Sequence, residues 1–264
     1  MEDAGDARRV LQQMDRWWRQ PLIGYASTMP DASGRRGVDV TATPGSRDPG
    51  RPKLVLGVYV ITAAGLVPGR GHAEVAAGAI EGGANAVQLR APEHGDAELR
   101  PLARALADRC RERGVLFIVD NRVELALACG AAGVHLGQGD PWPTARARLG
   151  PDLVLGVSVE DARQASAAEA AGADYLGVTV FASVTKPEAV PHGLRGLRRI
   201  SAATRLPVLG IGGIDAANAR QVLDAGAAGV AVISAVAAAP DPAAATRELV
   251  AVIRGTVGMP PYRP

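Results

Sequence analysis

The feature that most constrains the fold is a short motif that recurs four times at wide, regular intervals. The copies "GANAV", "GAAGV", "GADYL" and a second "GAAGV" begin at Gly83, Gly130, Gly172 and Gly226, so roughly 40 to 55 residues separate neighbours. In each copy a glycine ends an alanine-rich helical stretch, and a strand-like run follows. Because an interval of this length holds two strand-helix units, four copies predict an eight-fold barrel.

Eight apolar runs agree with that count. They are rich in Val, Ile and Leu without alternating polar residues, which is typical of parallel strands buried on both faces. A helix-sized segment follows each run, and this alternation predicts a parallel sheet. An open doubly wound sheet is the alternative, but "VITAAGLVPGRG" after the first run lacks the glycine pattern of a dinucleotide-binding turn. We expect strands at 54–61, 86–89, 115–119, 133–136, 153–159, 175–180, 207–211 and 229–233.

The predicted architecture is α/β, a single (β/α)8 TIM barrel with an N-terminal extension. We place the barrel at residues 54–255, the extension at 1–53 and a C-terminal tail at 256–264. Residues 27–53 are dense in Pro, Gly, Ser and charge, which is typical of a flexible linker. The helical spacing of apolar residues within 10–18 indicates one short amphipathic helix before it. The charged start has no apolar core of a signal peptide, so we expect neither secretion nor a membrane anchor.

The composition excludes several kinds of partner. With 29 Lys and Arg against 27 Asp and Glu, the net charge of +2 gives no field that would hold nucleic acid. No later run reaches membrane-spanning length without a charge or a turn residue. The two cysteines, Cys110 and Cys129, fall on apolar helix faces and are expected to be reduced and structural. These features favour a cytoplasmic protein.

In a TIM barrel the chemistry lies where the strands end and lead into the helices. Nearly every predicted strand is followed by a polar or glycine residue at that point. After strands seven and eight, "LGIGGI" and "VAVISAV" match the usual phosphate site of such barrels, although the glycines alone could form a tight turn. The candidates are Gln88, Arg90, Asp120, Asn121, Arg122, Gln138, Asp140, Ser158, Ser183, Thr185, Lys186, Gly212, Gly213 and Ser234.

These side chains favour diphosphate chemistry at a metal. Arg90, Thr185 and Lys186 supply charge and donors for a diphosphate leaving group, although Lys186 alone could be a surface lysine or form a Schiff base. Strands three and four are neighbours, so Asp120 and Asp140 can converge on Mg²⁺. For Asp120 the alternative is a helix N-cap. The four histidines show no metal-ligand spacing, and His135 is expected to be a satisfied interior residue.

Several motifs occur together in the order of a known family. They are "VQLR", the acid and amide pair after strand three, "GVHLGQGD", "GVSVED", "GADYLGV", "FASVTK" and "GIGGI". Over residues 54–255 the chain resembles the thiamine phosphate synthase family, whose relatives include a thiazole tautomerase. The resemblance implies a transferase of thiamine biosynthesis that joins a hydroxymethylpyrimidine diphosphate to a thiazole phosphate. Pyrophosphate would leave with the help of Mg²⁺ and give a stabilised pyrimidinyl cation.

The resemblance also implies roles for particular residues. Ser158, Lys186 and Arg90 would be catalytic, and Mg²⁺ would be held by Asp140 together with Asp120 and Asn121. Two positions depart from the family: Pro92 replaces a usual lysine, and the pair Asp120-Asn121 reverses the usual order of Asn and Asp. The implied substrate-binding residues are Gln88, Arg90, Asp120, Ser158, Ser183, Thr185, Lys186, Gly213, Ile233 and Ser234.

Two other functions stay open at this point. The departures at Pro92 and at the reversed pair are compatible with a tautomerase-like relative that uses the same pocket. The other alternative is a non-catalytic thiazole-phosphate-binding protein whose predicted helix with Trp17 and Trp18 docks elsewhere. Tautomerisation needs a general base near the thiazole, and no histidine occurs in the loop after strand six. The expected partners are small phosphorylated substrates, with no nucleic acid and no membrane, and a homo-oligomer is left open.

Overall fold

The computed structural model describes residue 54 and residues 56–257 of the 264-residue chain. The expected amphipathic helix within 10–18 and the linker at 27–53 lie outside the described residues, as does most of the expected tail. The last described helix ends at Val257, two residues beyond the predicted limit of the barrel at 255.

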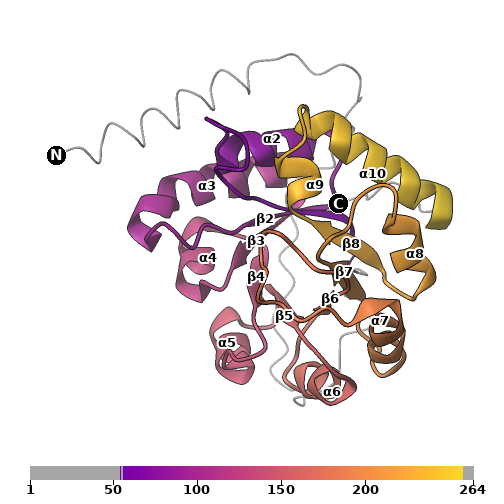
Figure 1. Ribbon diagram of the computed structural model, residues 1–264. Helices are drawn as coiled ribbons and strands as arrows, with labels where there is room; N and C mark the ends of the chain where they lie inside the picture. Colours follow the sequence, from indigo (N-terminus) through magenta and orange to yellow (C-terminus); the bar gives the residue numbers. More distant parts are fainter. Residues whose placement is uncertain (1–53, 55, 258–264) are drawn as a thin grey trace, which may run out of the picture.

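The described chain forms a closed barrel of eight parallel strands in sequential order, which confirms the predicted architecture (Figure 1). β1 pairs with both β2 and β8, so no strand edge is left open. The predicted strands are found at their predicted places, and apart from the start of β1 their ends agree to within one residue. The strands are β1 (Gly57–Ile61), β2 (Ala86–Leu89), β3 (Leu116–Asp120), β4 (Gly133–Leu136), β5 (Val154–Ser158), β6 (Tyr175–Thr179), β7 (Val208–Ile211) and β8 (Gly229–Val232).

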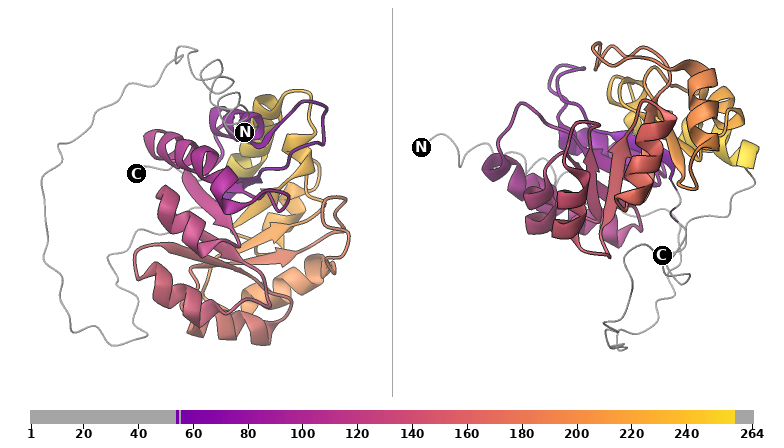
Figure 2. Two further views of the ribbon diagram at one scale, coloured as in Figure 1. Left: turned by 90° about the vertical axis from the view of Figure 1, so that its left-hand side faces the viewer. Right: turned by 90° about the horizontal axis from the view of Figure 1, so that it is seen from below.

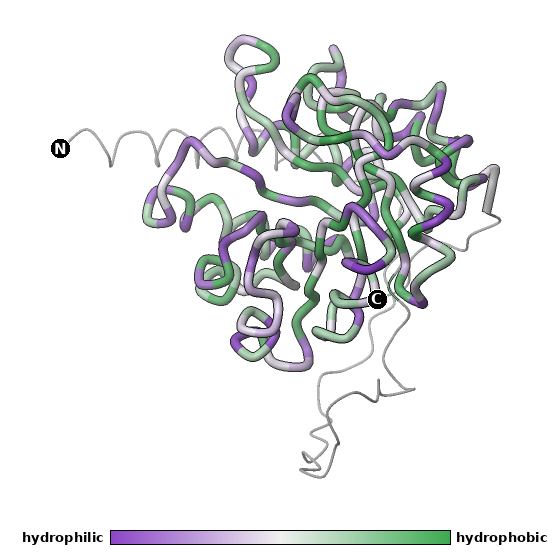
Figure 3. The backbone as a smooth tube through the Cα atoms, turned by 60° about the horizontal axis from the view of Figure 1, so that its bottom comes forward, coloured by the Kyte–Doolittle hydropathy of each residue, from purple (hydrophilic) through white to green (hydrophobic). Residues whose placement is uncertain are grey.

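Helices surround the barrel as an outer ring, which the three orientations of Figures 1 and 2 show. Hydrophilic and hydrophobic stretches follow one another along the coiled parts of the tube in Figure 3, as expected for helices that bury one face. The short α9 is the extra helix that barrels of this kind often carry after the eighth strand. The described helices are α2 (His72–Glu81), α3 (Asp96–Glu112), α4 (Val123–Cys129), α5 (Trp142–Leu149), α6 (Ala162–Ala170), α7 (Gly193–Ala202), α8 (Ala219–Asp224), α9 (Ser234–Ala237) and α10 (Pro242–Val257).

The recurring glycines end the helices as the repeat predicts. Gly83, Gly130, Gly172 and Gly226 all have positive φ, between 72° and 101°. In every copy the residue after the glycine donates its N–H to the carbonyl five positions earlier, which is the long hydrogen bond of a Schellman ending. The repeat is therefore a helix-stop signal that directs the chain into β2, β4, β6 and β8.

β1 begins three residues later than predicted. Gly57 has φ of +39°, a backbone conformation that interrupts an extended strand. The Asn85 side chain accepts a hydrogen bond from the Val58 N–H at 2.9 Å, and a Cβ on Gly57 would lie 2.1 Å from that Asn85 oxygen. The apolar run from residue 54 is therefore longer than the strand, which begins at Gly57.

Two apolar layers hold the barrel together. The larger lies between the sheet and the helices, and it includes the free and buried thiols of Cys110 and Cys129, as expected. The smaller fills the barrel interior and contains two tyrosines, Tyr59 and Tyr175. A Cβ on Gly156, the strand partner of Tyr175, would lie 2.1 Å from the Tyr175 ring, so a glycine is needed for the ring to fit. Among the described helices, none is long and apolar enough to cross a membrane.

Candidate active site

A cavity, partly open to solvent, lies at the carboxyl ends of the strands. Of the site residues predicted from the sequence, those that line it are Gln88, Arg90, Asp120, Ser158, Ser183, Lys186, Gly212 and Ile233. The other predicted residues do not line the cavity but lie in the chain next to lining residues or in the loops after β3 and β4. They are Asn121, Arg122, Gln138, Asp140, Thr185, Gly213 and Ser234.

The acid and amide pair at the end of β3 lies in two different environments, the cavity and the solvent. Asp120, the last residue of β3, lines the cavity with a carboxylate oxygen 3.7 Å from Arg90 Nε. Asn121 is exposed and has φ of +53°, a left-handed conformation that asparagine tolerates better than most residues. The N-cap alternative for Asp120 is wrong, because Arg122 is the N-cap of α4 and none of the described side chains caps that helix by a hydrogen bond.

Charges around Asp120 act on it in opposite directions. Burial raises the pKa of the Asp120 carboxyl, while the positive charges of Arg90 and Lys186 act to lower it. The charge of Asp140 raises the pKa of Asp120 further, so the two acids are within electrostatic reach. Two carboxylates that repel each other in this way favour a cation between or beside them.

Asp140 is fixed by its own loop. Its Oδ2 accepts the Gly137 N–H at 2.7 Å, and its backbone carbonyl accepts the Trp142 N–H at 2.9 Å. Gln138 is turned toward Glu160, to which its amide donates at 2.9 Å. Hard oxygen donors from one or two carboxylates are the protein contribution that Mg²⁺ usually takes, so the donor set at Asp120 and Asp140 fits that ion.

A hydrogen-bonded relay forms the floor of the cavity. Gln88 Nε2 donates to Tyr59 Oη at 3.0 Å, and the hydroxyls of Tyr59 and Tyr175 are 2.9 Å apart. Tyr175 Oη is 3.0 Å from His135 Nδ1, and His135 Nε2 is 2.9 Å from Ser158 Oγ. Both ring nitrogens of His135 are therefore satisfied, as expected for this residue, although the ring also lines the cavity.

The direction of this relay follows from its first and last members. An amide nitrogen only donates, so Tyr59 accepts from Gln88. Among the described contacts the acceptor left for the Tyr59 proton is the Tyr175 hydroxyl, so we assign Tyr59 as the donor of that bond. Tyr175 then donates to His135 Nδ1. Burial, aided by the charge of Lys186, lowers the pKa of His135 from 6.5 to about 4, so the ring is neutral. Because Nδ1 accepts from Tyr175, the single ring proton lies on Nε2. Ser158 accepts that proton, which leaves its hydroxyl hydrogen free to point into the cavity.

The loop after β6 supplies the other polar wall. Ser183 Oγ and Thr185 Oγ1 are 3.0 Å apart, and Lys186 lines the cavity although much of the residue is exposed. A Cβ on Gly212 or on Gly213 would lie 2.6 Å from a carbonyl oxygen of this loop, and both glycines have positive φ. These glycines consequently allow the loops after β6 and β7 to lie against each other.

Sequence reasoning did not identify Tyr59, Tyr175 and Thr179 as residues around the site. Tyr59 and Thr179 line the cavity, and Tyr175 links Tyr59 to His135. The signal in the sequence was a tyrosine within each of two otherwise aliphatic strands, because a buried tyrosine hydroxyl usually has a hydrogen-bond partner.

A cavity lined by charged and hydroxyl side chains at the carboxyl ends of a closed parallel barrel is typical of a (β/α)8-barrel enzyme. The family model for thiamine monophosphate synthase matches residues 58–236. The chain is 49% identical over 199 residues to a thiamine-phosphate synthase of Moorella thermoacetica, covering 74% of this chain and 95% of that protein. It is 47% identical over 197 residues to one of Methanoregula boonei, covering 74% and 91%.

A solved structure shows the same relationship. The thiamine phosphate pyrophosphorylase of Pyrococcus furiosus superposes with a TM-score of 0.72 at 41% identity, covering 78% of this chain and 99% of that one. The chain belongs to the thiamine monophosphate synthase family. The resemblance drawn from the sequence motifs is thereby confirmed.

Proposed function

We propose that the protein is a thiamine phosphate synthase that joins a hydroxymethylpyrimidine diphosphate to a thiazole phosphate. The observation that carries the proposal is the division of one cavity into two parts. Its floor offers uncharged hydrogen-bonding groups from Gln88 and Ser158, while its wall carries the charges of Arg90, Lys186 and Asp120. A substrate with a neutral ring at one end and a diphosphate at the other suits such a cavity.

The chain's residues bind the two ends of the pyrimidine substrate. The hydroxyl hydrogen of Ser158 and the amide of Gln88 would orient the ring on the floor. Arg90 and Lys186 would hold the diphosphate, whose negative charge grows as its bond to the methylene carbon breaks. Asp120 and Asp140 would hold Mg²⁺, with the Asn121 amide close to Asp120 in the chain. When bound, the ion would neutralise charge on the diphosphate.

The reaction balances without a proton transfer. The carbon–oxygen bond between the pyrimidine methylene and the diphosphate breaks, and its electron pair leaves with pyrophosphate. The lone pair of the thiazole nitrogen then forms the new carbon–nitrogen bond to the pyrimidinyl cation. Gly213, Ile233 and Ser234 would hold the thiazole phosphate through backbone N–H groups, and Thr185 would add a hydroxyl donor.

The experiment that tests this proposal is synthesis of thiamine phosphate from both precursors with Mg²⁺. We expect turnover by the wild-type chain and its loss in Asp140→Ala, because the metal site would lose a carboxylate. Arg220→Ala serves as a control, since Arg220 forms an ion pair with Asp224 on the exposed surface of α8. Failure of the wild type to form product would contradict the proposal. Near-normal turnover in Asp140→Ala would contradict the metal assignment.

The competing functions have their own readouts. A tautomerase would exchange a substrate proton without the pyrimidine diphosphate, yet the imidazole of the cavity, His135, already uses both ring nitrogens. A non-catalytic binding protein would take up thiazole phosphate with an affinity indifferent to Mg²⁺, which calorimetry measures. The charged wall of the cavity favours the synthase over both.

A further inference from the structure

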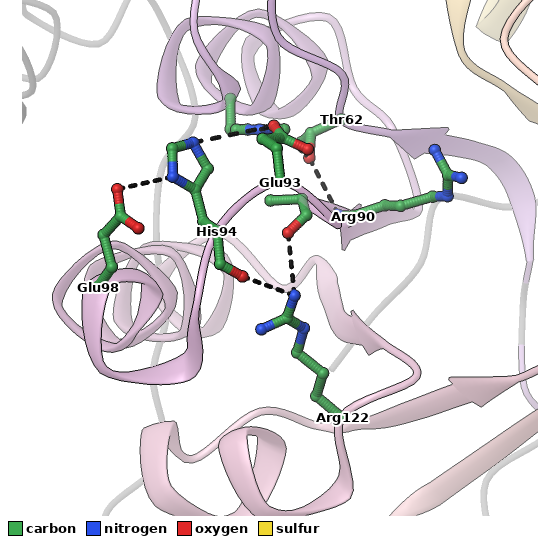
Figure 4. Close-up of polar contacts among 8 residues, drawn as sticks. Thr62, Arg90, Glu93, His94, Glu98 and Arg122 are labelled. Atoms are coloured by element: carbon green, nitrogen blue, oxygen red, sulfur yellow. Dashed lines mark hydrogen bonds and ion pairs between the residues drawn. The ribbon is translucent and has the colours of Figure 1, made fainter.

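A second cluster of ligand-type side chains lies outside the cavity, where the loop after β2 approaches the start of α2. It consists of His72, Glu93 and His94, whose ligand atoms all lie within 4.8 Å of one another. The spacing of the histidines in the sequence did not indicate this cluster, because β2 and its loop separate His72 from the other two residues. Figure 4 shows Glu93 and His94 side by side, with Thr62, Arg90 and Glu98 around them.

The distances in the cluster suit a small tetrahedral ion. Glu93 Oε1 is 2.9 Å from His72 Nε2 and 3.9 Å from His94 Nε2. Zinc bonds of roughly 2.0–2.2 Å in a tetrahedron place neighbouring ligand atoms about 3.3–3.6 Å apart. The two distances lie on either side of that range, and all the ligand atoms of the cluster are within 4.8 Å of one another.

Outer partners already orient both imidazoles. His94 Nδ1 is 2.6 Å from Glu98 Oε1, and a carboxylate only accepts, so this nitrogen carries a proton. When the ring is neutral, the lone pair of His94 Nε2 is therefore free, 3.9 Å from the Glu93 carboxylate, and a cation between the two would bind both. His72 Nδ1 is in turn 3.0 Å from Thr62 Oγ1. A second hydrogen bond on the far nitrogen of each ligating histidine is usual at metal sites.

We propose that His72, Glu93 and His94 form a binding site for a first-row transition metal of the Zn²⁺ type. Two imidazoles and one carboxylate are a donor set that zinc commonly takes, and a water molecule would complete the tetrahedron. Mg²⁺ prefers oxygen ligands, so the site is chemically distinct from the pair Asp120 and Asp140. His72 is 6% exposed, which places one ligand in a fixed, buried position.

The site is coupled to the backbone of a residue in the cavity wall. Thr62 Oγ1 accepts the Arg90 N–H at 3.2 Å, and it also contacts His72. In the metal-free cluster, His72 Nε2 donates to Glu93, so Thr62 donates its hydroxyl proton to His72 Nδ1. A metal on Nε2 moves the proton of the neutral ring to Nδ1. Thr62 then accepts from both His72 and Arg90, and its hydroxyl must rotate.

The loop after β2, which carries Glu93 and His94, is also held in place by hydrogen bonds from Arg122. Arg122 donates to the carbonyls of Ala91 and His94 at 3.1 and 2.7 Å, as drawn in Figure 4. A metal would add a bond from this loop to the first turn of α2. We therefore expect metal binding to raise the melting temperature of the protein.

The chain offers a well-defined titration of Zn²⁺. It contains four histidines, of which His135 is engaged at both nitrogens, and its two cysteines are buried. An untagged, full-length protein in excess Mg²⁺ would be titrated with Zn²⁺ against a chromophoric chelator. We expect one tight site per chain, and Co²⁺ in its place should give the strong visible bands of a four-coordinate ion.

Variants identify the ligands. His94→Ala and Glu93→Ala should lose the tight site, and Glu98→Gln should weaken it by roughly 10- to 100-fold, as is usual for outer partners. His192→Ala is the matched control and should bind like the wild type. Equal affinity in wild type and His94→Ala would overturn the proposal, as would loss of binding in His192→Ala.

Two further measurements distinguish this site from Zn²⁺ binding at the Asp140 loop and from a cluster that holds only a proton. Asp140→Ala should retain the Zn²⁺ site, because the proposed Mg²⁺ ligand lies elsewhere; loss of Zn²⁺ binding there would contradict a separate site. Nitrogen NMR should show the His72 proton moving from Nε2 to Nδ1 when Zn²⁺ is added. An unchanged His72 spectrum and an unchanged melting temperature would mean that His94 carries only a proton between Glu93 and Glu98, and would overturn the metal assignment.

Discussion

The substitution Tyr175→Phe should weaken both the barrel and the orientation of the cavity floor. The Tyr175 hydroxyl accepts from Tyr59 and donates to His135 Nδ1, so it serves two buried groups at once. Phenylalanine keeps the ring against Gly156 and removes only the hydroxyl group. The change therefore removes hydrogen bonds while the packing of the ring stays in place.

The magnitude follows from the two groups that lose their partner. Leaving a buried polar group unsatisfied costs about 1–3 kcal/mol. Here the Tyr59 hydroxyl loses its acceptor and His135 Nδ1 loses its donor. Because Tyr59 keeps its bond from Gln88, we expect the free energy of unfolding to fall by about 2–4 kcal/mol. Urea denaturation of both proteins under identical conditions measures this difference.

A matched variant separates the effect on stability from the effect on the site. Tyr59→Phe removes a hydroxyl from the same ring pair but leaves the bond from Tyr175 to His135. Both variants should be destabilised, whereas only Tyr175→Phe frees His135 to place its proton on either nitrogen. Nitrogen NMR of His135 reports the proton position, and turnover should fall further in Tyr175→Phe than in Tyr59→Phe.

Two results would refute this reasoning. One is a Tyr175→Phe protein within about 0.5 kcal/mol of the wild type, the range of an ordinary surface substitution. The other is a Tyr59→Phe protein whose His135 shifts its proton as much as in Tyr175→Phe, because the relay would then have the opposite direction.

Three other substitutions test separate parts of the structure. The pKa of His135 falls from 6.5 to about 4 on folding, so the unfolded chain binds the proton first as pH falls. We expect the free energy of unfolding to decrease by about 3 kcal/mol between these pH values. Denaturation followed against pH measures this decrease, which should be absent in His135→Asn. Asn121→Val should cost about 1–2 kcal/mol in thermal unfolding, since φ is +53°, whereas Asn121→Gly should not. Arg146 donates to three backbone carbonyls and to Asp174, so Arg146→Ala should lower the free energy of unfolding by about 2–4 kcal/mol. A decrease of less than about 1 kcal/mol in urea denaturation would contradict this prediction.

The sequence predicted the fold well because its signals are local. Each recurring glycine ends a helix through contacts with residues only a few positions away, and each buried strand is a continuous apolar run. The expectation that site residues follow the strand ends also identified Gln88, Arg90 and Ser158, which line the cavity. These positions depend only on knowing where a strand stops.

The relay and the histidine cluster needed the closed barrel. Tyr59 and Tyr175 are separated by 116 residues, and their hydroxyls meet only because strands from opposite halves of the chain point side chains into one interior. His72 and Glu93 are 21 residues apart and meet only once α2 begins beside the loop after β2. Contacts of this kind leave no periodic pattern in the sequence.

The order of Asp120 and Asn121 shows how one backbone angle decides what a motif does. Successive residues of a regular strand point to opposite faces, so a reversed pair is expected to turn its carboxylate away from the cavity. The structure avoids this outcome because β3 ends at Asp120, and the left-handed Asn121 follows as the first residue of the turn. The two positions are therefore not equivalent strand positions with their residues exchanged. The last strand position, Asp120, faces the cavity and Arg90, whereas the turn position, Asn121, is exposed to solvent. This chain therefore has its carboxylate at the position that faces the cavity.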